Sequence, residues 1–204
     1  MTQDRTEQFA DTLIQRCQDL AMARSETVAI PFDKYIHIRD FTQILVFNCY
    51  STAVSALENG EIKDSQLHDL FFEYLYFFIH LTDRFAFSTI GAPGRHTLMQ
   101  ELGEFAVMLA VQVLFPRSTD QQRDMIFQDR MGDLNIAARE YSHFPKLFPD
   151  GNEGTKDTLI WEFSKKIEKM MGSENNLGAV LGRHYVVITL LKNLDIKSFL
   201  NKMK

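Results

Sequence analysis

The sequence predicts an all-α fold: a single-domain bundle of about seven helices, with an aromatic-rich helix over residues 64–90 at its centre. The ten glycines and five prolines gather mainly in clusters, and the long stretches between them are typical of helices joined by short turns. A chain of 204 residues with 45% hydrophobic residues can bury roughly two thirds of its unfolded surface. We therefore expect one helical domain, 1–204, with a possible subdivision only near the loop 145–154.

Seven stretches carry helical features. Apolar residues recur at steps of three and four in the first and the sixth stretch, which indicates amphipathic helices. A polar residue followed three places later by glutamine, the spacing of a capping box, predicts that the second, fourth and fifth begin near Asp40, Thr97 and Ser118. Six of the predicted helices cover about residues 4–24, 40–60, 64–90, 97–115, 118–144 and 175–202. The sixth in chain order lies between the loop 145–154 and Gly172, with an apolar seam from Leu159 to Met170.

Proline and glycine predict the breaks between these helices. Pro31 and the β-branched residues near it favour an extended connection over residues 26–37. The Gly-Ala-Pro-Gly run at 91–94 predicts the end of the central helix, because both residue types interrupt helical hydrogen bonding. In the last helix Gly178 and Gly182 lie one turn apart, so we expect a neighbouring backbone to approach closely there.

Composition and charge exclude several classes of function. The 22 basic and 27 acidic residues give a net charge of -5, which provides no general attraction to nucleic acid. The first residues lack a secretion signal, and polar residues interrupt the longest charge-free stretch, 41–57, so we expect no membrane span. Cys17 and Cys49 lie far apart without a metal-binding pattern. A cytoplasmic protein with two reduced thiols is the favoured interpretation.

The predicted central helix combines aromatic residues with one polar stripe. It holds eight of the chain's twenty-four aromatic residues, between Phe71 and Phe87, and apolar side chains point nearly all round it. Its polar residues recur at alternating steps of four and three, which aligns them along one face, and Arg84 lies one turn beyond His80. These residues are Asp69, Glu73, Tyr76, His80, Asp83 and Arg84.

Two interpretations of this stripe stay open. The residues face solvent or pair with neighbouring helices, as on many helices, and then they carry no function. Alternatively the stripe faces a cavity, and Glu73, Tyr76, His80, Asp83 and Arg84 form a ligand-binding site. In that case Glu73, His80 and Asp83 could hold a metal ion or act as acid and base.

Two further motifs resemble metal sites without completing them. Glu140 and His143 have the ExxH spacing of ferritin-like di-iron bundles, but a second such pair is missing and the apolar seam of their helix faces the other way. The loop starting at Asp150 begins like a calcium loop, yet Thr155 and Trp161 stand where glycine and glutamate are needed. We assign no metal ligand and no cofactor.

The function expected from the sequence is binding. The aromatic residues would contact a partner protein, a second copy of the chain in a homo-oligomer, or an apolar small molecule, unless the core takes them up. The alternative is a metal-dependent or acid-base enzyme that uses the polar stripe. The sequence contains neither a nucleophile elbow nor a phosphate-binding loop that would favour a particular chemistry.

Overall fold

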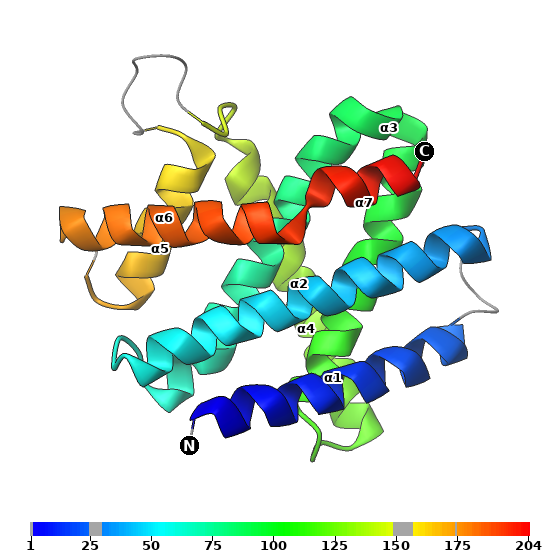
Figure 1. Cartoon of the computed structure of the whole chain (residues 1–204), viewed down its shortest axis with the longest axis horizontal. Coiled ribbons are helices and arrows are strands. Elements are labelled where there is room, and N and C mark those ends of the chain that lie inside the picture. The colour runs from blue at the N-terminus through cyan, green and yellow to red at the C-terminus, as the bar shows by residue number, and fades with distance from the viewer. Residues whose placement is uncertain (1, 25–29, 149–156, 174) are drawn as a thin grey trace.

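The structure is a computed structural model that describes residues 2–24, 30–148, 157–173 and 175–204. These residues form a helical bundle without strands, which confirms the predicted all-α class (Figure 1). The elements in chain order are α1 (Thr2–Arg24), α2 (Phe32–Glu58), the 3-10 turn η1 (Asp64–Gln66), α3 (Leu67–Leu114), α4 (Asp120–Ser142), α5 (Leu159–Met170), α6 (Leu177–Leu194) and α7 (Ile196–Lys202).

Helix α2 begins two turns earlier than predicted. The extended connection expected over 26–37 is wrong from Phe32 onward, and residues 25–29 lie outside the described part. Pro31 directly precedes the helix with φ -55° and ψ 142°, and its carbonyl accepts a hydrogen bond from the Tyr35 amide at 2.9 Å. Because the first amides of a helix have no intrahelical acceptor, a proline there costs no hydrogen bond. Pro31 starts the helix instead of preventing it.

Two boundaries between helices differ from the prediction, one at Gly91 and one at Asp195. The break predicted at 91–94 is present as a turn within α3, where Gly91 has φ 72° and ψ 176°. The two arms on either side of Gly91 correspond to the third and fourth predicted helices. The single helix predicted over 175–202 is wrong at Asp195, whose left-handed backbone (φ 40°, ψ 50°) separates α6 from α7.

The first arm of α3 lies at the centre of the bundle, as predicted. Helix α3 contacts α1, α2, α4, α5 and α7, and Figure 1 shows these helices around it. Phe77 is fully buried and stacks on Phe163 of α5, with ring centroids 3.7 Å apart. Phe87, near the turn, is 62% exposed. Phe85 is half-buried. The core takes up the other six aromatic residues almost completely: Phe71, Phe72, Tyr74, Tyr76, Phe77 and Phe78.

The C-terminal helices pack against the same core as the N-terminal ones. Phe199 of α7 stacks on Phe41 of α2, with ring centroids 4.1 Å apart. The Lys34 ammonium donates a hydrogen bond of 2.8 Å to the carbonyl of Met203, near the end of the chain. These contacts join α2 to the last helix, α7.

The backbone at Gly91 gives a first testable prediction. Its φ and ψ lie in a region that is nearly exclusive to glycine, so Gly91→Ala should destabilise the protein by about 1–3 kcal/mol. Nothing lies within 4 Å of an added Cβ there, so backbone strain alone is tested. Gly132→Ala, also unobstructed but within α4, is the control and should stabilise by about 0.5–1 kcal/mol. Urea unfolding measures both changes, and equal effects would contradict this account.

Candidate functional site

The polar stripe of α3 is covered by neighbouring helices and is divided between two recesses. Asp69, Glu73 and Tyr76 line a recess of about 230 Å³ with residues of α4 and with Lys166 of α5. His80 and Asp83 line a separate recess of about 360 Å³, the His80 pocket, between the two arms of α3 and α4. The structure therefore does not bring the predicted ligand-binding residues to one site.

Glu73 belongs to a group of side chains that satisfy one another. It accepts a hydrogen bond from the Tyr141 hydroxyl and an ion pair from Lys166 at 2.7 Å. Lys166 also contacts Glu140 at 2.8 Å, so one ammonium serves two carboxylates. Burial and the Glu73 carboxylate raise the pKa of Tyr141 well above its usual value, and the hydroxyl remains a donor. Glu73 thus joins α3 to α4 and α5.

Asp83 and Arg84 also have structural partners. Both oxygens of the Asp83 carboxylate accept hydrogen bonds from Arg95, at 2.6 and 2.5 Å, across the turn at Gly91. Arg84 donates to the carbonyls of Phe144, at 2.6 Å, and of Pro145. Both charged groups are therefore already paired within the chain, and a ligand contact by Asp83 or Arg84 stays a prediction.

The metal-binding interpretations find no support in the geometry. Among the described residues, no three His, Cys, Asp or Glu side chains are close enough together to hold a metal ion. Glu140 is paired with Lys166, and His143 lies exposed at the end of α4, with its Nδ1 3.1 Å from the Glu140 carbonyl. The calcium-like loop, residues 150–156, falls outside the described residues.

Within the described chain, two buried polar atoms of the stripe have no hydrogen-bond partner, the His80 Nε2 atom and the Tyr76 hydroxyl. His80 is only 7% exposed, and within the described part of the chain nothing hydrogen-bonds to its buried Nε2 atom. The Tyr141 ring packs against the imidazole, with centroids 5.6 Å apart. Burial, followed by the positive charge of Arg84, lowers the pKa of His80 to about 4, so the ring is neutral near pH 7. A buried ring nitrogen without a partner is rare in folded proteins.

The remaining walls of the His80 pocket are largely apolar. Ile79 belongs to the first arm of α3, Met99 to the second, and Met131, Leu134 and Ala138 to α4. The polar groups around them come from both arms and from α4. They are Asp83, His96, Gln100, Glu104 and Asn135.

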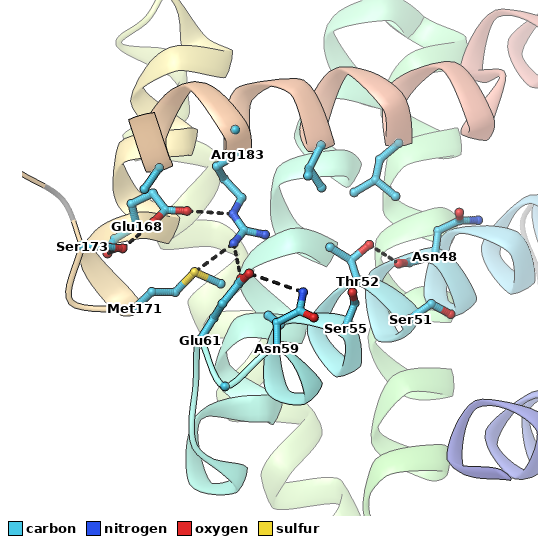
Figure 2. Close-up of a pocket in the computed structure, with 16 residues that line it drawn as sticks. Asn48, Ser51, Thr52, Ser55, Asn59, Glu61, Glu168, Met171, Ser173 and Arg183 are labelled. Atoms are coloured by element: carbon cyan, nitrogen blue, oxygen red, sulfur yellow. Dashed lines mark hydrogen bonds and ion pairs between the residues drawn. The ribbon is translucent and has the colours of Figure 1, made fainter. Parts of the chain in front are cut away.

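The largest described recess, about 840 Å³, is the α2–α6 cleft (Figure 2). Its α2 wall carries small polar side chains that include Ser51, Thr52 and Ser55, and its α6 wall is mainly apolar. The Ser51 hydroxyl is buried and has no hydrogen-bond partner within the described residues. In the sequence these polar residues argue only against a membrane span, although their spacing places them on one helical face.

Arg183 closes one end of this cleft through a buried network. Its guanidinium donates to Glu168 at 2.9 Å and to Glu61 at 2.7 Å (Figure 2). It also donates to the Tyr74 hydroxyl at 3.3 Å. These contacts join α6 to α5, α3 and the segment that follows α2. This network cannot be recognised in the sequence, because Arg183 has no charged neighbour at helical spacing. Its partners Glu168, Glu61 and Tyr74 are 15, 122 and 109 residues away.

The glycines of α6 do not have the expected role. Nothing lies within 4 Å of a Cβ added at Gly182, and at Gly178 the nearest such atom is the Asn176 side-chain oxygen at 3.3 Å. No neighbouring backbone of the described chain therefore packs closely on either glycine. Gly182 instead widens the α2–α6 cleft, which it lines.

One segment has the length and composition of a membrane span. This segment, Gly94–Leu114, is the second arm of α3, and 61% of its most apolar window is buried inside the bundle. The buried core helix of a bundle meets the same criteria of length and composition. The predicted absence of a membrane span stays a prediction.

The Arg183 network gives a second prediction. Glu168 is 5% exposed at its side chain, so Arg183→Met leaves a buried carboxylate without its counter-charge and should cost about 3–5 kcal/mol in unfolding free energy. Adding Glu168→Gln should recover part of this loss. Lys165→Met, which removes an exposed ion pair with Glu162, is the control and should cost at most about 1 kcal/mol. Urea unfolding checks the series, and similar costs for both single variants would contradict it.

His80 gives a third prediction, on pH dependence. Its pKa is about 4 in the folded protein and 6.5 in the unfolded chain, so the unfolded chain binds the extra proton between these values. Stability should be complete above pH 6.5 and fall as the pH approaches 4. Replacing the ring by phenyl, His80→Phe, should make the loss between pH 7 and 4.5 smaller by about 2 kcal/mol. If the unfolding free energy falls equally with pH in the wild-type protein and in His80→Phe, the pH dependence does not come from His80.

Comparison with known proteins assigns no family. No protein-family model matches the chain, and no curated protein or solved structure matches it either. Among the described recesses, the His80 pocket combines a deeply buried, unsatisfied imidazole with apolar walls.

Proposed function

We propose that this protein binds a small molecule in the His80 pocket. The observation that carries the proposal is the buried His80 imidazole, whose Nε2 has no partner among the described residues, on the wall of a recess of about 360 Å³. Leaving such a group unsatisfied costs about 1–3 kcal/mol, which a hydrogen-bonding ligand in the pocket would offset. Ligand pockets combine apolar walls with a few polar groups in this way.

Binding agrees with the pocket chemistry better than acid-base catalysis does. A neutral imidazole has one donor and one acceptor nitrogen, so it can fix the orientation of a ligand. The nearest carboxylates are committed to guanidinium groups: Asp83 to Arg95, and Glu104 to Arg24 at 3.0 Å. An acid-base mechanism needs a second group within reach that can exchange protons, and both of these carboxylates already form ion pairs. Binding of a partner protein, or of a second copy of the chain in a homo-oligomer, stays a prediction.

The proposed setting is the cytoplasm, without a nucleic-acid partner or a membrane span. Cys17 and Cys49 are both free and buried. Burial raises the pKa of Cys17 to about 11, which keeps its thiol protonated and unreactive. Reduced, buried thiols and a net charge of -5 support this proposal.

Methionine methyl groups provide the test, because they mark the recesses separately. Met99 and Met131 line the His80 pocket, whereas Met171 lines the α2–α6 cleft. In protein carrying ¹³C-methyl methionine, a library of anionic, cationic and neutral fragments should contain molecules that shift the Met99 and Met131 signals. Ala138→Leu fills the pocket from α4 and should weaken these hits at least about tenfold. Ala179→Leu fills the α2–α6 cleft instead and should leave them unchanged.

The same spectra contain the result that would overturn the proposal. If no fragment shifts Met99 and Met131, or if Ala179→Leu and Ala138→Leu weaken the hits equally, the His80 pocket is not the binding site. Hits that shift Met171 alone would transfer the function to the α2–α6 cleft.

A further inference from the structure

We infer that the ligand of the His80 pocket is an uncharged ring compound with one amide-like or phenol-like group that hydrogen-bonds to His80. This inference rests on the proposed function and adds the chemical class of the ligand. Three features of the pocket carry it: the pairing of its charges, the thioethers in its walls, and the position of the imidazole.

The carboxylates of the pocket already contact arginines from outside it. Asp83 holds Arg95 in a two-point contact, and Glu104 shares Arg24 with Glu101, at 3.0 and 3.2 Å. Neither arginine belongs to the pocket lining. A charged ligand would lose its hydration in a pocket whose carboxylates already contact arginines and whose further histidine, His96, is exposed to solvent, and that loss is unfavourable. The pocket therefore selects against anions and cations alike.

The walls favour a flat ring. Met99 and Met131 reach the pocket from α3 and α4, together with Ile79 and Leu134. Thioethers adapt to ligand shape and make favourable contacts with aromatic rings. At about 360 Å³ the recess lies near the lower end of the range for ligand pockets, so it accommodates one small ring system with a short substituent.

The polar group of the ligand is set by His80 and by nearby amides. A neutral imidazole can donate through one nitrogen and accept through the other, and Asn135 carries both kinds of atom, whereas the Gln100 amide nitrogen already donates to Glu104 at 3.3 Å. An amide or phenol matches this set, because each can donate and accept a hydrogen bond. A purely apolar ring would leave the His80 nitrogen as unsatisfied as it is in the free protein.

Three molecules with one ring and different charges test the ligand class: benzamide, benzoate and benzylammonium. Each is titrated at pH 7.5 into the full-length protein with ¹³C-methyl methionine, and the Met99 and Met131 signals report binding. Benzamide should bind at least about tenfold more tightly than either ion. If benzoate or benzylammonium binds as tightly as benzamide, the inferred class is wrong while the proposed function stands. If the fragment library reaches the pocket but benzamide does not, the class is wrong as well.

The role of His80 is tested with a matched apolar probe. In His80→Phe the affinity for benzamide should fall about threefold to tenfold, because one hydrogen bond is lost, while the affinity for toluene stays the same or rises. Equal losses for both molecules would mean that His80 only shapes the pocket, and would overturn its assigned contact.

A measurement on the unaltered protein covers the case in which His80→Phe does not fold. With ¹⁵N-labelled histidine, benzamide should shift the ring-nitrogen signals of His80 and leave those of His184, on α6, in place. His184 is a suitable control because it is also partly buried and has an unpartnered Nδ1 within the described chain. An unchanged His80 signal at saturating benzamide would overturn the inference.

Discussion

The burial of the first arm of α3 on nearly every side is the constraint on which the rest of the structure depends. A helix in this position offers little solvent to the ionisable residues beyond its first turn, so these residues need partners from the surrounding structure. Glu73 obtains Tyr141 and Lys166, Asp83 obtains Arg95, and the Tyr74 hydroxyl obtains Arg183. These polar contacts give the neighbouring helices specific positions around a core that is otherwise aromatic, and the exceptions on this arm are the His80 Nε2 atom and the Tyr76 hydroxyl, which have no hydrogen-bond partner within the described chain.

The regular features of the fold could be predicted from local patterns. Apolar periodicity and glycine-proline clusters identify most helices and the break at Gly91. The remaining differences arise where one residue permits two conformations. Pro31 can interrupt a helix or precede one, and Asp195 adopts a left-handed backbone without glycine, stabilised by its side chain accepting from the Ser198 amide at 3.3 Å. Neither choice is visible in a pattern of apolar residues.

The candidate site was only partly predictable for a related reason. Helical spacing identified His80, since residues on one face share their surroundings. It could not separate His80 from Glu73 and Arg84, because the partners of these residues come from α4, α5 and the segment after α4. Satisfaction of a polar group is a property of the tertiary structure. The orphaned nitrogen of His80 and the buried contacts of Arg183 could therefore be recognised only once the helices were assembled.

The fold of α3 back along itself at Gly91 has an evolutionary consequence. All residues that line the His80 pocket lie between Ile79 and Ala138, in one uninterrupted piece of the chain. The termini and the last three helices contribute none of the lining. Substitutions in those outer parts can thus leave the lining unchanged, provided that they keep the contacts of Arg24 with Glu104 and of Tyr141 with His80.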